Sequence, residues 1–172
     1  MNHRAFLSAL AVTWATAASA EPLDPCALLS GADLLELEVP AGTAPVHKDQ
    51  PGGVHACEYK PQSASGATQT VTVMVSDAAR DRVLQFRAML AKALSENTQA
   101  QLEARGEYYA APVMCKVAAS AQLETSQCLG ATEQSVVALA LSHSKLGDKP
   151  AYPTVPLRLI SALVARVGAA GG

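Results

Sequence analysis

Valines occupy alternate positions of residues 69–75, with Thr or Met between them. This period of two is typical of a strand with one buried face, and residues 55–60 repeat it with His55 and Cys57 on one side. We expect these two strands to pair. Residues 135–141 are apolar on both faces, which is typical of a central strand covered on each side.

Helical spacing predicts two longer helices. One begins at Ser76 or Asp77 and closes near Asn97, and the other follows a predicted loop at residues 142–153. In each helix the apolar residues fall on one face: Val83, Phe86, Leu90 and Leu94 in the first, and Leu157, Ile160, Val164 and Val167 in the second. Such stripes indicate helices that cover a sheet.

A shorter helix is predicted near the N-terminus. Ser30 is a favourable N-cap, Asp33 stands at the third helical position, and Leu29 can pack on Leu34 as a hydrophobic staple. Because proline cannot continue a helix, this one should end before Pro40.

The remaining segments are predicted from turn residues and short apolar runs. Proline and glycine without periodicity indicate loops at residues 39–53 and 61–68, and the glycine-rich end indicates a disordered tail at 168–172. Short strands are expected at residues 108–109, 113–117 and 127–129. We therefore expect one α+β domain at residues 21–172: a mainly antiparallel sheet covered by the two longer helices, plus the short N-terminal helix and two disulfides.

Residues 1–20 have the features of a signal peptide. His3 and Arg4 give a basic start, an apolar run follows, and residues 18–20 form a small-residue cleavage site before Glu21. The apolar stretch of about 16 residues is shorter than the roughly 20 that a bilayer span needs. We expect a periplasmic or secreted protein without stable membrane insertion.

Removal of the first 20 of the 172 residues leaves 152, which is enough for one hydrophobic core. The mature chain keeps 12 basic and 15 acidic residues, a formal charge of −3, and the two signs are interspersed. This charge argues against binding to nucleic acid and against general attraction to anionic membranes.

All four cysteines lie in the mature part: Cys26, Cys57, Cys115 and Cys128. An even number in an exported chain indicates two structural disulfides, each contributing about 3 to 4 kcal/mol on the loop-entropy model. Three pairings are possible, and chain order favours Cys26 with Cys57 and Cys115 with Cys128. The sequence has no Cys-x-x-Cys motif, which argues against a redox or zinc site built on these residues.

The run Asp-Pro-Cys-Ala-Leu-Leu at residues 24–29, followed by Ser30 and by Cys-Glu-Tyr at residues 57–59, resembles a family of small exported proteins of unknown function. That family is common among actinobacterial secreted lipoproteins, and the resemblance covers residues 24–60. It implies a pairing of Cys26 with Cys57 and a compact α+β fold similar to PsbP-like domains. This chain departs from the family in lacking a lipid-attachment cysteine and in having a second cysteine pair, and the family brings no activity to carry over.

Motifs for catalysis or phosphate binding are missing from the sequence. Ser63 and Ser65 lack the Gly-x-Ser-x-Gly frame of a hydrolase, and the Gly-Gly pair at residues 52–53 is not a phosphate loop. Two carboxylate pairs are best interpreted as solvated charges: Glu36 with Glu38, and Glu103 with Glu107. We expect no cofactor and no catalytic residue.

One constellation has metal-binding chemistry: His47, His55 and Asp49, with His143 as an outlying member. His47 and His55 flank a glycine-rich loop and could converge on one ligand. Scattered histidines are usually surface side chains, so the sequence predicts no metal site and leaves His47 and His55 as its candidates.

The chain is therefore expected to be a non-enzymatic binding or accessory module of the cell envelope, with a protein or an envelope component as its partner. An inhibitor or immunity-type protein that blocks an enzyme through residues 39–53 belongs to this class. The alternatives are an enzyme of unrecognised pattern and a periplasmic metal-binding protein that uses His47 and His55.

Overall fold

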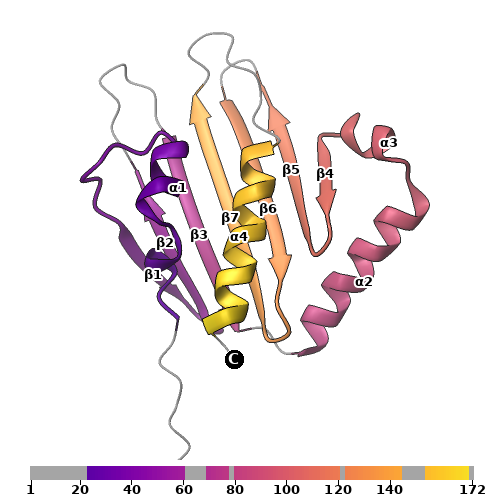
Figure 1. The fold of residues 1–172 in the computed structure, drawn as a ribbon, viewed down its shortest axis with the longest axis horizontal. Helices are drawn as coiled ribbons and strands as arrows, with labels where there is room; N and C mark the ends of the chain where they lie inside the picture. The colour runs from indigo at the N-terminus through magenta and orange to yellow at the C-terminus, as the bar shows by residue number, and fades with distance from the viewer. Residues whose placement is uncertain (1–22, 61–68, 78–79, 121–122, 145–153, 171–172) are drawn as a thin grey trace, which may run out of the picture.

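A computed structural model describes residues 23–60, 69–77, 80–120, 123–144 and 154–170. The predicted signal peptide, the turn predicted at residues 61–68 with its two serines, and most of the predicted loop at residues 142–153 lie outside this part of the chain. Within it, seven strands form one antiparallel sheet in the order β1-β2-β3-β7-β6-β5-β4 (Figure 1). The fold is therefore α+β, as predicted.

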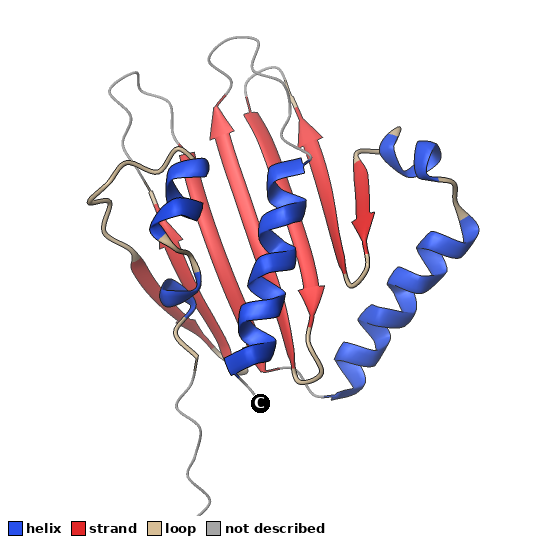
Figure 2. Cartoon of the chain, viewed as in Figure 1, coloured by secondary structure: helices blue, strands red, loops and turns tan. Residues whose placement is uncertain are grey.

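The predicted elements occur in the expected order, with further ones between them (Figure 2), and the strands expected at residues 108–109, 113–117 and 127–129 are longer than predicted. The strands are β1 (Val46–Gln50), β2 (Val54–Tyr59), β3 (Gln69–Asp77), β4 (Glu107–Ala110), β5 (Val113–Ala119), β6 (Leu123–Ala131) and β7 (Ser135–Ser144). The helices are η1 (Pro25–Leu28, a 3-10 helix), α1 (Gly31–Glu36), α2 (Arg80–Glu96), α3 (Gln99–Glu103) and α4 (Thr154–Ala170). The pairing of β2 with β3 and the central place of β7 are as predicted. The expectation that β7 is covered on each side is wrong: the face of Val137 and Leu139 is buried, while Val136, Ala138 and Ala140 on the other face are half-buried.

One face of the sheet forms the core. Helices η1, α1 and α4 lie over this face (Figure 1), and the valines of β3 that point toward them are at most 3% exposed. Antiparallel partners share a face, so a single row can be followed across six strands. Its members are Cys57, Val73, Leu139, Cys128, Cys115 and Tyr108. Both disulfides therefore lie on the covered face, one at β2 and the other between β5 and β6.

The N-terminal segment contains two capped helices in succession. Ser30 and Asp33 form the predicted capping box of α1, with the Ser30 amide donating to Asp33 Oδ2 at 2.8 Å. Helix η1 was not predicted, although Asp24 caps it and Pro25 stands at its start. A cap followed by proline is a helix-start signal, but the helix is only one turn long and leaves no periodic pattern.

Helix α4 packs over β6 and β7, and its predicted stripe is confirmed. Ile160, Val164 and Val167 are buried, and Leu157 is half-buried. Helix α4 lies close against β6 at Gly130, because a Cβ atom there would overlap a methyl group of Val164. A side chain at this position would push the helix away from the sheet.

Helix α2 differs from its prediction in two ways. It begins at Arg80, because β3 continues through Ser76 to Asp77 in register with β7. It also lies on the β4 side of the sheet (Figure 1), and its Arg87 guanidinium donates to the carbonyl of Thr132 just after β6. Of the two longer helices, α4 thus covers the central strands, while the stripe of α2 is buried at Val83 and Leu90 alone.

Three further segments depart from the predictions. Residues 46–50 form strand β1 inside the predicted loop, because they pair with β2 although they carry no apolar period. Residues 168–170 continue helix α4 where a disordered tail was predicted, since alanines 169 and 170 favour helix. Helix α3 was missed, although Thr98 and Gln101 form a capping box at its start.

An ion pair connects the two ends of the described chain. The Arg166 guanidinium on α4 donates to the Leu28 carbonyl at 2.6 Å and to Asp33 Oδ2 at 2.7 Å. Asp33 is only 6% exposed. Burial alone would raise the pKa of its carboxyl, but hydrogen bonds from Arg166 and Ser30 outweigh burial and lower it. The C-terminal helix is thereby held against η1 and α1.

We expect Gly130→Ala to lower the free energy of unfolding by about 1–3 kcal/mol, because the added methyl group overpacks the contact between β6 and α4. Equilibrium unfolding in urea measures the change. Gly168→Ala is the matched control: its Cβ would lie 3.8 Å from Thr132, and alanine favours the helix by about 0.5–1 kcal/mol. Equal stability of Gly130→Ala and the parent protein would contradict the packing described above.

The lowered pKa of Asp33 predicts a loss of stability in acid. Below about pH 4 the unfolded chain binds a proton that the folded carboxylate resists, so stability falls as the pH drops through the folded pKa. The free energy of unfolding should decline less between about pH 5 and pH 3 in Asp33→Asn than in the parent. Glu58 also has a lowered pKa, but it remains in both proteins, and the difference reports on Asp33. If the free energies of unfolding of Asp33→Asn and of the parent declined in parallel with falling pH, the lowered pKa of Asp33 would be contradicted.

Candidate functional site

The candidate site lies where the core row reaches the open edge of the sheet. His47 on β1 is the Cα partner of Cys57, and Asp49 is the partner of His55. Partners across an antiparallel pair, and residues two apart on one strand, share a face. The hairpin therefore presents His47, Asp49 and His55 on the same side as the buried Cys57, beyond the part of the face that the helices cover.

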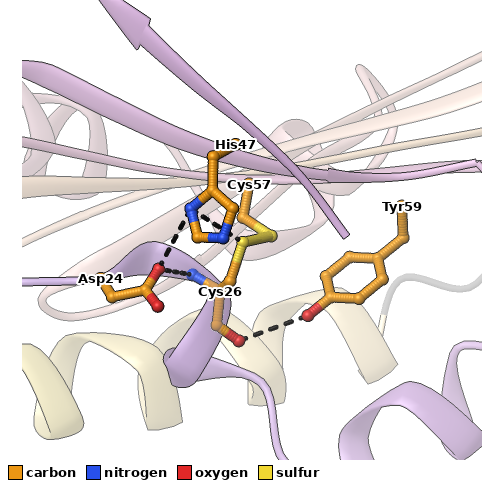
Figure 3. The surroundings of a disulfide bond; sticks show 5 residues. All are labelled: Asp24, Cys26, His47, Cys57 and Tyr59. Carbon is orange, nitrogen blue, oxygen red and sulfur yellow. Dashed lines mark hydrogen bonds and ion pairs between the residues drawn. A yellow bond between two sulfur atoms is a disulfide. The ribbon is translucent and has the colours of Figure 1, made fainter. Parts of the chain in front are cut away.

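A disulfide fixes the N-terminal segment beside this hairpin. Cys26 of η1 is bonded to Cys57 of β2, with their Cα atoms 5.0 Å apart (Figure 3). Tyr59 supports the same turn by donating its hydroxyl to the Cys26 carbonyl at 3.3 Å. Burial, together with the nearby Asp24 carboxylate, raises the pKa of Tyr59, so the phenol keeps its proton and remains a donor.

Asp24 and His47 meet over the disulfide. Asp24 Oδ1 accepts from the Cys26 amide at 2.8 Å, which is its capping role in η1. The same oxygen lies 3.5 Å from His47 Nδ1, and this nitrogen is also 3.5 Å from Cys26 Sγ (Figure 3). Because Cys26 is in a disulfide, it offers no thiolate. Asp24 and His47 are the two groups of this cluster with ligand chemistry.

A second pair lies beside the first. His55 Nδ1 is 2.8 Å from Asp49 Oδ1, directly across the hairpin. Both pairs border one open depression of about 200 Å³, which is lined by Leu23, Asp24, Pro25, His47, Asp49, His55 and Ala56. His47, His55 and Asp49, the residues grouped from the sequence, thus border one depression together with Asp24. In the part of the chain that the structure describes, the metal-type ligand atoms within 4.8 Å of one another are those of Asp24, Cys26 and His47.

The opposite face of the hairpin carries separate charges. The Glu58 carboxylate forms ion pairs with Lys48 Nζ at 2.6 Å and with Lys60 Nζ at 2.5 Å. Hydrogen bonds from Lys48 and then Lys60 lower the pKa of Glu58, although burial opposes them. Lys48 and Lys60 therefore pair with Glu58 on the opposite face. They do not neutralise the charged groups that border the depression.

The remaining candidates lie elsewhere. Cys115 and Cys128 are direct partners on β5 and β6, with Cα atoms 4.0 Å apart. The backbone of His143 is on β7, which β3 separates from β2, so His143 does not belong to the cluster. The glycines at 52 and 53 form the β1–β2 turn, where both have positive φ.

The carboxylate pairs considered from the sequence do not face one another as catalytic pairs. Glu36 forms an ion pair with Arg158 of α4, and Glu103 accepts from Gln99. Glu107 is paired with Arg105 and lies 3.8 Å from Lys116. Their contacts are those of surface charges, in line with the interpretation from the sequence.

Two acidic residues were missed by the sequence argument. Asp24 could have been found from the Asp-Pro signal for a capped turn. Glu124 on β6 gave no signal, yet it is 2% exposed and its Oε1 atom has no hydrogen-bond partner within the described chain. Glu124 lies on the core face of β6, three strands away from the hairpin that holds the depression.

Comparison with known proteins identifies no relative: no family model matches the chain, and no curated protein or solved structure is similar to it. None of the helices in the described ranges is long and apolar enough to cross a membrane. Two cysteine pairs at bonding distance fit an exported protein, because such bonds persist in oxidising compartments.

We expect the two disulfides to contribute unequally. Cys26–Cys57 closes 31 residues and Cys115–Cys128 closes 13, so the loop-entropy model gives about 3.7 and about 2.9 kcal/mol. Urea unfolding of Cys26→Ala/Cys57→Ala and of Cys115→Ala/Cys128→Ala tests this order. The first double variant should also lose protection of the η1 amides from hydrogen exchange. Unchanged stability in both double variants would show that neither bond stabilises the fold.

Proposed function

We propose that this chain is an exported, non-enzymatic binding module of the cell envelope, which holds an extended segment of a partner protein along the outer edge of β1. The observation that carries the proposal is the open edge of the sheet: all five residues of β1 are exposed. Its location in the periplasm or outside the cell belongs to the same proposal and is supported by the cysteine pairs and the signal-peptide pattern.

An edge strand offers hydrogen-bonding groups that a partner can use. Alternate N–H and C=O groups of β1 bond to β2, and the others point outward. Among the described residues, no backbone group outside the β1–β2 ladder bonds to residues 46–50. A partner strand could therefore add to the sheet by main-chain hydrogen bonds alone, which is a recurring mode of peptide recognition.

The two edges of the sheet differ, and the difference favours β1. Helix α3 lies beside β4 at the opposite edge (Figure 1), anchored by the buried Leu102. Natural sheets commonly protect an edge by such a covering element. β1 has no described element along its outer side and is protected only by charged side chains, Lys48 and Asp49. Charge keeps an edge soluble and still permits a specific partner.

Proline substitutions at adjacent positions test the proposal. In an edge strand one of two neighbouring N–H groups points toward the sheet and the other points outward. Of Lys48→Pro and Asp49→Pro, one should lose a ladder bond and stability, and the other should stay as stable as the parent. The stable variant is the informative one, because it lacks only an outward donor.

Binding is measured by photo-crosslinking during export. A photoreactive residue at Val46 should yield one discrete adduct with an envelope protein, and a probe at the exposed Arg82 on α2 is the control. The adduct from position 46 should be reduced at least about tenfold in the stable proline variant, the effect of losing roughly 1.4 kcal/mol. An adduct unaffected by proline, or equal adducts from both probe positions, would contradict strand addition, and so would the absence of any adduct.

A further inference from the structure

We propose that the depression between η1 and the β1–β2 hairpin is a site for a zinc-type divalent cation. Its ligands are Asp24, His47 and His55, and Asp49 orients His55. The inference rests on the geometry of these four side chains and does not depend on the proposed partner strand. The carboxylates and imidazoles of this set suit zinc and copper(II), and neutral imidazole is the commonest metal ligand in proteins.

The spacing of Asp24 and His47 suits a shared ion. In a tetrahedral zinc site with bonds of about 2.0–2.1 Å, neighbouring ligand atoms stand roughly 3.3 Å apart. Asp24 Oδ1 and His47 Nδ1 are separated by 3.5 Å, longer than a normal hydrogen bond and close to that ligand spacing. The two atoms therefore need little movement to bind one cation.

His55 has the arrangement of a supported ligand. Histidines that bind metals usually place the second ring nitrogen against a carboxylate, which fixes the ring and raises its basicity. His55 Nδ1 is 2.8 Å from Asp49 Oδ1, and its Nε2 atom has no hydrogen-bond partner among the described residues. His55 lines the same depression but lies outside the group of ligand atoms within 4.8 Å of one another, which is Asp24, Cys26 and His47. The exposed side chains of Asp24 and His47 must therefore turn toward Nε2 of His55 to complete the site.

The local charge also favours a cation. With neutral imidazoles, Asp24 and Asp49 give the depression a formal charge of −2. The nearest lysines on the hairpin, Lys48 and Lys60, bind Glu58 on the opposite face. They do not compete for the carboxylates of the site.

The disulfide holds the ligands in place. Cys26 is two residues from Asp24, and Cys57 is the cross-strand partner of His47. The bond therefore ties the segment that supplies Asp24 to the hairpin that supplies His47 and His55. A site with fixed ligands loses less entropy on binding, and this explains how side chains that are 59% and 51% exposed at His47 and Asp24 could still bind one ion.

Calorimetric titration of the tag-free, oxidised exported protein with zinc chloride tests the proposal. We expect one zinc per chain, and we expect the imidazole NMR signals of His47 and His55 to shift while those of His143 do not. His47→Ala and His55→Ala should each weaken binding at least tenfold, and the double variant should abolish it. Asp49→Asn should weaken binding about 10- to 100-fold, as loss of a carboxylate behind a ligating histidine does elsewhere.

His143→Gln is the histidine control, and Asp81→Asn, at an exposed position on α2, is the carboxylate control. Both should bind zinc like the parent. Thermal melts without zinc establish that each variant is folded. If the two histidine–aspartate pairs have no metal role, the protein will show no saturable zinc binding up to millimolar concentration, or zinc binding will weaken equally in the control variants. Either result would overturn the site.

Discussion

The rest of the structure depends on the bond between Cys26 and Cys57. Helix η1 is a single turn and α1 is barely two, and helices this short are not stable by themselves in water. The disulfide attaches them to β2, and Arg166 closes the same region from the other side by binding Asp33 and the Leu28 carbonyl. These two attachments complete the cover over the β2–β3 side of the core.

The same bond also determines where the candidate site lies. The row of core residues runs from Tyr108 to Cys57 under the helices, and its next member, His47, lies beyond them. A polar residue at that position is solvated, yet it stands against the disulfide and the cap of η1. The depression is thus a consequence of how the N-terminal segment ends against an edge hairpin.

Much of this fold follows from sequence patterns wherever a pattern has a single physical cause. The alternating valines of β3, the Ser30–Asp33 capping box and the stripe of α4 each report one face buried against one neighbour. β1 could not be predicted in this way, because a strand exposed on both faces has no apolar period and is stabilised only by pairing with β2. Asp24 reaches the site through a tertiary contact, because it stands 23 positions before His47 in the sequence.

The site and the open edge occupy one hairpin, and this has a physical reason. Interior strands such as β3 and β7 use their backbone groups and one face for the fold itself. β1 uses only its inner hydrogen bonds, so its outer backbone and its side chains on both faces remain available. Polar residues on β1 do not disturb the core, because their side chains are exposed. The Cys26–Cys57 bond ties the neighbouring strand β2 to η1. Rigid support beneath exposed polar groups is the arrangement that binding sites need, and in the described chain it is found together at this hairpin.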